Sequence, residues 1–217
     1  MWRHTLGLGT ASTKSRCGGG PPRLASRCCS CEAAPVEISH KRFVRSVLTP
    51  DEATEVKQVD ALATELSQHL QANSTQIDLV HVHRAQSSAV QLIVSSLLKE
   101  RLGFREEVVL TPSEGFVTHA RPDFVYALGP GRGIIAEVER AGTTTNNHDL
   151  KDVWKAHIAS DAQHLFLIVP NANWNEAGAA RERPFARVLV RLGSFFGDPR
   201  REIDVVSLHV FGYGRPA

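Results

Sequence analysis

Two short apolar segments separated by the residues GPGRG constrain the fold of this chain most strongly. Residues 122–128 and 133–140 are rich in the apolar residues that form buried strands. The glycines and proline between them favour a hairpin-type connection, so the two segments should be neighbours in one sheet. Because the connector joins strand to strand and no helix follows it, we do not interpret it as a phosphate-binding loop.

The segments around this hairpin alternate between helical and strand patterns. We predict helices at residues 87–102, 147–160 and 183–196, and further strands at residues 104–110, 165–170 and 203–211. The helix over 147–160 should bury one stripe, made of Leu150, Val153, Trp154, His157 and Ile158. Three sequential strands followed by a helix and another strand predict an α/β fold with a central mixed sheet of four to five strands and flanking helices.

A further helix should precede this core at residues 50–72. Thr49, Pro50 and Glu52 form a capping-box start, and apolar residues then recur at helical spacing as far as Leu70. We predict that this helix is an addition to the core, which either packs on it or offers a face to a partner.

Residues 1–40 differ in composition from the rest and are predicted to be a disordered tail ahead of one domain at 41–217. All four cysteines lie in this tail, at positions 17, 28, 29 and 31, and they lack the second ligand pair of a zinc site. A cysteine-free body fits a reducing, cytoplasmic location. The basic tail also resembles an organelle transit peptide or a translated upstream region, and these alternatives stay open.

The charge of the chain is unevenly distributed. The net charge is +2, but residues 1–31 contain five Lys or Arg and no acid, so the remainder holds 20 basic and 23 acidic side chains. If the body binds a polyanion, clustered basic residues must do so. No run of 18 apolar residues occurs, so we predict no membrane span.

Three carboxylates interrupt the predicted hairpin. Glu137 and Glu139 are two residues apart in a strand and should project to one face, and Asp123 begins the neighbouring strand. Unpaired charges are costly to bury, so Arg121 and Arg140 or a divalent cation must compensate them. An all-oxygen site of this kind suits Mg²⁺ or Mn²⁺ better than Zn²⁺.

These residues resemble the PD-(D/E)XK nuclease superfamily, which includes many restriction endonucleases. Pro122-Asp123 matches the PD element, Glu137-Val138-Glu139 matches the (D/E)-x-K element, and the predicted element order over residues 87–170 is similar to the common core of the superfamily. Glu139 stands where the family usually has lysine. The following helix offers Lys151 or Lys155 instead, with Lys155 the better match.

The resemblance implies a Mg²⁺- or Mn²⁺-dependent DNA endonuclease, used for example in restriction or defence. Asp123 and Glu137 would bind the metal, and Glu139 or Lys155 would orient or deprotonate the attacking water. Glu139 in the lysine position also leaves open an inactive nuclease-fold module that binds nucleic acid or a protein. Many such nucleases act as homodimers, and the helix at 50–72 could serve that arrangement.

Polar residues between the acidic strand and the next helix are candidate phosphate ligands. Thr144, Asn146 and Asn147 offer hydroxyl and amide donors at a predicted helix N-terminus, where they could bind substrate or simply cap the helix. The polar segment 171–175 follows a strand and is predicted to be a turn, which could contact DNA.

Overall fold

The computed structural model describes residues 38–110 and 121–216. Its larger helices are α1 (Pro50–Ala72), α2 (Ser74–Val80), α3 (Ser87–Leu98), α4 (His148–Ile158) and α5 (Pro184–Gly193). Its main sheet comprises β1 (Ser39–Val44), β2 (Arg105–Glu106), β3 (Phe124–Gly129), β4 (Arg132–Val138), β5 (His164–Pro170) and β8 (Ser207–Tyr213). A separate hairpin pairs β6 (Asn173–Trp174) with β7 (Ala180–Glu182).

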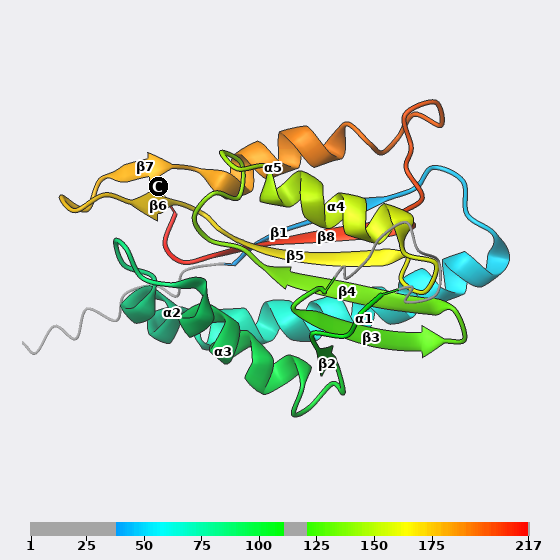
Figure 1. Cartoon of the computed structure of the whole chain (residues 1–217), viewed down its shortest axis with the longest axis horizontal. Coiled ribbons are helices and arrows are strands. Elements are labelled where there is room, and N and C mark those ends of the chain that lie inside the picture. Colours follow the sequence, from blue (N-terminus) through cyan, green and yellow to red (C-terminus); the bar gives the residue numbers. More distant parts are fainter. Residues whose placement is uncertain (1–37, 111–120, 217) are drawn as a thin grey trace, which may run out of the picture. The chain divides into compact units, whose positions relative to one another are not determined.

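The main sheet is mixed and has the strand order β1-β8-β5-β4-β3-β2. Strand β5 runs parallel to both β4 and β8, and the other neighbours are antiparallel. Figure 1 shows α1, α2 and α3 on one face of this sheet and α4 and α5 on the other. The predicted α/β class with a mixed, helix-flanked sheet is confirmed, although the sheet has six strands rather than four or five.

Strand β1 accounts for the extra strand. It pairs antiparallel with β8 and begins at Ser39, inside the segment predicted to be a disordered tail; residues 1–37 lie outside the described part of the chain. Its sequence SHKRFV is polar, and most of its residues are exposed or half-buried. An edge strand of this kind lacks the apolar alternation on which strand prediction depends.

The predicted strand over residues 104–110 is wrong in length, because only Arg105 and Glu106 pair with β3. Glu107 has a φ of 47°, a left-handed conformation that a strand cannot accommodate. Helix α3 ends at Leu98, somewhat earlier than predicted, and Gly103 provides the left-handed turn after it. The segment predicted as a turn at 171–175 instead starts the β6–β7 hairpin.

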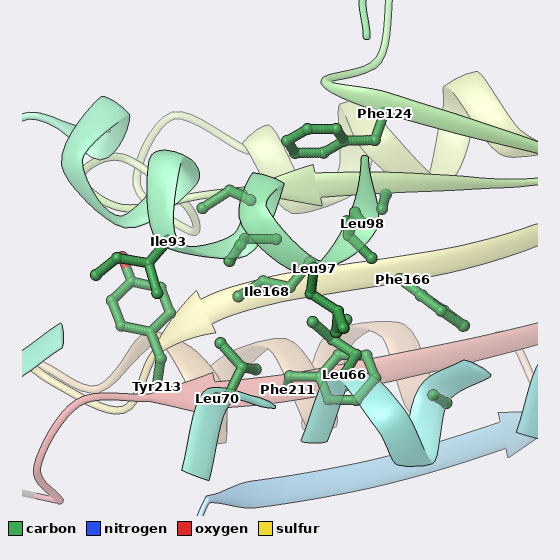
Figure 2. Close-up of a cluster of buried hydrophobic side chains, with 14 of the residues drawn as sticks. Leu66, Leu70, Ile93, Leu97, Leu98, Phe124, Phe166, Ile168, Phe211 and Tyr213 are labelled. Carbon is green, nitrogen blue, oxygen red and sulfur yellow. The ribbon is translucent and has the colours of Figure 1, made fainter. Parts of the chain in front are cut away.

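The larger apolar core lies between the sheet and helices α1 and α3 (Figure 2). Leu66 and Leu70 of α1 and Leu97 of α3 are fully or almost fully buried there, and they face aromatic residues of the sheet such as Phe166 and Phe211. Burial of this kind stabilises each large side chain by about 1.5–3 kcal/mol. Helix α1 is therefore part of the core, and its apolar stripe is covered rather than offered to a partner.

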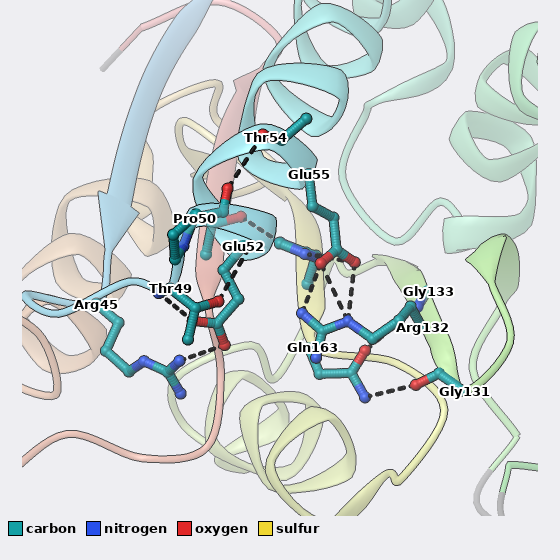
Figure 3. A network of polar contacts seen from close by, with 12 residues as sticks. Arg45, Thr49, Pro50, Glu52, Thr54, Glu55, Gly131, Arg132, Gly133 and Gln163 are labelled. Carbon is teal, nitrogen blue, oxygen red and sulfur yellow. Dashed lines mark hydrogen bonds and ion pairs between the residues drawn. The ribbon is translucent and has the colours of Figure 1, made fainter.

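The start of α1 is fixed by polar contacts, which Figure 3 shows. Thr49 and Glu52 form the predicted capping box, with Thr49 Oγ1 accepting from Glu52 N at 3.2 Å and Glu52 Oε2 accepting from Thr49 N at 2.8 Å. One turn later, Glu55 accepts hydrogen bonds of 2.6–3.1 Å from the guanidinium of Arg132 on β4. A forked arginine–carboxylate pair of this kind fixes the helix relative to the β3–β4 hairpin.

The β3–β4 hairpin turns at Pro130 and Gly131, and Gly131 has a φ of 66°. Gly133, the first buried residue of β4, lies close to the backbone of neighbouring segments. A Cβ at this position would lie 2.7 Å from both Asp161 O and Tyr126 O. Gly133→Ala should therefore lower the free energy of unfolding by about 1–3 kcal/mol. Gly129→Ala is the matched control, since its Cβ would meet nothing within 4 Å and its cost should stay below about 0.5 kcal/mol. Equal denaturant midpoints for the two variants would contradict this account.

In the described part of the chain, no helix combines the length and apolar character needed to cross a bilayer.

Candidate functional site

Asp123 and Glu137 lie side by side on neighbouring strands. Antiparallel pairing of β3 with β4 sets Phe124 opposite Ala136, so Asp123 lies next to Glu137. Asp123 Oδ2 accepts a hydrogen bond from Val138 N at 2.9 Å, and Glu137 Oε2 accepts one from Asp123 N at 3.2 Å. Each carboxylate is thus held by the backbone of the other strand.

Glu139 follows directly after β4 and is held by three different elements. Its backbone N–H donates to Ile168 O on β5 at 2.8 Å, and its carbonyl accepts from the Tyr213 hydroxyl of β8 at 2.9 Å. Its side-chain Oε2 lies 2.8 Å from Nδ1 of His148, at the first turn of α4. The backbone contacts fix the direction of the strand end, and His148 fixes the carboxylate.

Lys155 of α4 supplies the ammonium group of the site. Its Nζ lies 2.7 Å from Glu137 Oε1 and 2.9 Å from Asp152 Oδ1. Lys151, the alternative left open by the sequence, is exposed. A lysine therefore does reach the carboxylates, although it comes from the helix and not from the strand position that Glu139 occupies.

The predicted buried face of α4 is wrong, because the helix is rotated about its axis relative to the prediction. Trp154, which was expected to be buried, is 59% exposed, whereas the buried residues are Asp149, Asp152, Val153 and Ala156. These four follow the spacing i, i+3, i+4, i+7, which marks one helix face equally well. A sequence prediction that considers only apolar residues does not select this face, because two of its four residues are aspartates.

Both buried aspartates of α4 have a cationic neighbour. Asp152 contacts Lys155, and Asp149 Oδ2 lies 3.4 Å from Nε of Arg191 on α5. Asp152 is a member of the site that sequence reasoning missed. The signal that could have found it is its position three residues before Lys155 on the same helix face.

The site contains more carboxylates than cations, and this imbalance appears in the pKa values. Burial and the charge of Asp152 raise the pKa of Glu137 to about 8, although Lys155 opposes the rise. Burial, together with the charge of Glu139, raises the pKa of Asp152 to about 7, and burial also raises the pKa of Asp123. For Lys155, burial alone would lower the pKa, but Asp152 and Glu137 outweigh it and raise the pKa. An added cation would relieve this excess of negative charge.

Most of the site, although not the buried Asp152, lines an open cleft of about 550 Å³. Asp123, Glu137, Glu139 and Lys155 all contribute to it, and so does His148. Further lining residues come from the start of α3 and from two arginines, and comprise Gln86, Ser87, Ser88, Gln91, Arg121 and Arg140. All four residues predicted to be catalytic are therefore brought together at one solvent-accessible place.

The three predicted substrate ligands lie elsewhere. Thr144 lines a cleft against α5, and Asn146 lines a cleft against the β6–β7 hairpin. Asn147 occupies the N-cap position of α4 in a left-handed conformation without a side-chain capping bond, and its Oδ1 accepts from Arg191 at 2.7 Å. None of the three lines the carboxylate cleft itself.

The donor set suits a hard divalent cation. In residues 38–110 and 121–216, no three His, Cys, Asp or Glu side chains are grouped closely enough to hold a metal ion by themselves. Mg²⁺ does not need such a group, since it keeps several waters and is usually bound by one or two carboxylates together with substrate phosphate. Asp123 and Glu137, adjacent and open to the cleft, match that requirement.

No protein-family model matches the chain, and a comparison with curated proteins likewise gives no match.

Proposed function

We propose that this protein is a divalent-metal-dependent endonuclease that hydrolyses phosphodiester bonds of DNA. The observation that carries the proposal is the cluster of Asp123, Glu137 and Lys155. Each of the two neighbouring carboxylates accepts a hydrogen bond from the backbone of the other segment, and an ammonium group lies 2.7 Å from Glu137 in an open cleft.

The order of the elements around the cluster supports the same proposal. Helix α3, strands β2, β3 and β4, helix α4 and strand β5 follow one another along the chain, as in the common core of the PD-(D/E)XK superfamily. Asp123 precedes the second of these three strands, and Glu137 lies near the end of the third. Lys155 brings an ammonium group to a site whose usual lysine position is Glu139.

Each side chain has a chemical task in this reaction. Asp123 and Glu137 would hold the cation, which when bound lowers the pKa of a water and neutralises charge on the phosphate. Glu139, fixed by His148, is placed to accept a proton from the attacking water. Lys155 can stabilise negative charge that builds up on the phosphate, and the exposed Arg121, which lines the cleft, can position the phosphate.

A cleavage assay of the full chain tests this proposal. Supercoiled plasmid and single-stranded DNA are incubated with Mg²⁺ or Mn²⁺, beside Asp123→Ala, Glu137→Ala and the control Lys151→Ala. We expect the first two substitutions to reduce cleavage by about 100-fold or more, as loss of a directly acting charged group does. Lys151→Ala, on the exposed side of α4, should cleave like the wild type. Cleavage that survives both Asp123→Ala and Glu137→Ala would refute the assignment of the site.

The second candidate is a nuclease-fold module that binds nucleic acid or a protein without cleaving. Glu139 in the place of the usual lysine favours it, because this position carries a negative charge in a site already rich in carboxylates. Wild-type protein that retains DNA but releases no product with either metal would favour this candidate over the endonuclease.

A further inference from the structure

Two further clefts adjoin the carboxylate cleft. The first, of about 520 Å³, is lined by Arg84, Arg140 and Arg181 and by the β6–β7 hairpin. It shares Arg140 and Ala141 with the carboxylate cleft. The second, also of about 520 Å³, lies at the start of α5 and shares Arg181 and Glu182 with the first. Because neighbouring clefts share lining residues, the three lie next to one another on the surface.

We call the two added clefts the arginine groove. It is lined by six arginines, namely Arg84, Arg140, Arg181, Arg183, Arg187 and Arg191. The only acid lining it in the described part of the chain is Glu182. Since residues 32–217 as a whole contain more acids than bases, this concentration of arginine is local.

Four of these arginines have charge to offer a ligand. The other two already make contacts within the protein. Arg140 donates a hydrogen bond to Val82 O, and Arg191 pairs with Asp149 and donates to Thr144 O. The other four, Arg84, Arg181, Arg183 and Arg187, are exposed and make no ion pair with any residue in 38–110 or 121–216. Exposed guanidinium groups that lack a carboxylate partner are suited to phosphate, which they can bind through two hydrogen bonds.

The groove also contains an aromatic side chain and a strained backbone position. Trp174 of β6 lines the first cleft, and the guanidinium of Arg215 lies 4.1 Å from the centre of its ring. Arg84 has a φ of 62°, a conformation that is uncommon for residues other than glycine, and it lines the same cleft. A half-buried tryptophan among arginines is the arrangement on which unpaired nucleobases stack.

We propose that the arginine groove binds the backbone of the nucleic-acid strand whose phosphodiester lies in the carboxylate cleft, with a base stacking on Trp174. This inference rests on the proposed function, because the endonuclease site defines which strand is bound. The phosphates would contact Arg84 and Arg181 in the first cleft and Arg183 and Arg187 in the second. Such contacts position a strand without reading its sequence.

Binding of a labelled single-stranded oligonucleotide to the full chain in EDTA tests the groove without cleavage. Fluorescence anisotropy is measured over a range of salt concentrations for wild type, for the double variant Arg84→Ala/Arg181→Ala, and for Arg200→Ala. Each lost phosphate contact should lower the salt slope for a single strand by about 0.7, so the double variant should lose about 1.4 and bind at least tenfold more weakly. The basic segment 1–31 is present in all variants and cancels in the comparison.

Two controls are matched to the substitutions. Arg200 is 84% exposed on the loop before β8, which Figure 1 shows at the end of the molecule away from β6 and β7, and Arg200→Ala should bind like the wild type. Trp174→Ala should weaken binding about fivefold or more, whereas Trp154→Ala, on the outer face of α4, should leave it unchanged. A double variant that matches Arg200→Ala in affinity and slope overturns the proposal, and so does a wild type that binds no oligonucleotide.

Failure of the groove and failure of the endonuclease give different results. If the double variant loses binding while wild type never cleaves with Mg²⁺, the proposal for the groove is supported and the catalytic proposal is refuted. If wild type cleaves and the double variant binds and cleaves equally well, the proposal for the groove is refuted and the catalytic proposal is supported.

Discussion

Lys155→Met should lower the free energy of unfolding by about 3 kcal/mol at pH 8, the cost of removing one partner from a buried ion pair. The side chains of Glu137 and Asp152 are only 4% and 3% exposed, and the Lys155 ammonium lies within 3 Å of both. Methionine fills a similar volume but leaves two buried carboxyls without a cation. Urea unfolding in EDTA measures the loss, and Lys151→Met, one turn earlier on the exposed side of α4, is the matched control.

The destabilisation caused by Lys155→Met should grow with pH. Glu137 and Asp152 have folded pKa values of about 8 and about 7, above the values near 4 that they have when unfolded. A carboxyl of this kind favours the folded state most at low pH, and its contribution is lost as pH rises through the folded pKa. At pH 5 both groups hold protons, so removing the ammonium costs little. A destabilisation that is the same at pH 5 and pH 8 would contradict the ion-pair explanation.

A second substitution separates the ion pair from simple packing. Glu137→Gln in the Lys155→Met background removes one of the two uncompensated charges and should recover part of the lost stability at pH 8. In a double-mutant cycle the coupling between these positions should be about 1–3 kcal/mol. Purely additive effects would show that the methionine acts through its shape alone.

The hairpin and its carboxylates were predictable because local rules determine them. Alternation along a strand fixes that Glu137 and Glu139 leave the sheet on one face, and the turn at Gly131 brings Asp123 to the end of β4. The exact pairing of Asp123 with Glu137 also depends on a register shift between Ala127 and Gly129, which the turn alone does not predict. Glu137 does face α4, the helix that carries Lys155. The capping box at Thr49 likewise depends on residues only three apart and is confirmed.

Features decided by distant partners could not be predicted in the same way. The rotation of α4 depends in part on Arg191, which is far from Asp149 in sequence but lies 3.4 Å from its carboxylate in the fold. Once a carboxylate is compensated, it can occupy a position that apolar periodicity assigns to leucine or tryptophan. The polar strand β1 is similar, because its hydrogen bonds come from β8 at the other end of the chain.

Two histidines buried between α1 and the sheet should each make the folded state less favourable as pH falls. His164 on β5 and His209 on β8 are almost fully buried, and burial lowers their pKa values to about 4 and about 3. His164 Nε2 lies 3.4 Å from Glu55, and His209 Nε2 lies 3.3 Å from Asp60, but these acids of α1 do not offset the burial. Both histidines are therefore neutral in the folded protein at neutral pH.

The sign of the pH effect follows from the unfolded state, in which both histidines titrate near pH 6.5. Because the folded pKa values are lower, stability is present in full above pH 6.5 and is lost as pH falls toward 4 and 3. Each histidine contributes up to about 1.4 kcal/mol per pH unit once the pH is below 6.5, so the two together should remove about 3 kcal/mol between pH 6.5 and pH 5. Because the raised pKa values of Glu137 and Asp152 shift stability in the opposite direction over this range, the histidine contribution is measured as the difference in urea midpoints between wild type and a histidine variant.

His209→Phe should remove about half of the stability loss that the two histidines cause in acid. The ring of His209 stacks near His40 and meets Phe166 edge-on, and a phenyl ring can keep both contacts without taking up a proton. The substitution also leaves His40 and Asp60 without this partner, so the variant should be less stable than wild type at pH 7.5 and approach it in stability at pH 5. His157→Gln, at a half-buried position on α4, should keep the wild-type slope. Parallel pH–stability curves for His209→Phe and wild type would show that the buried imidazole does not drive acid unfolding.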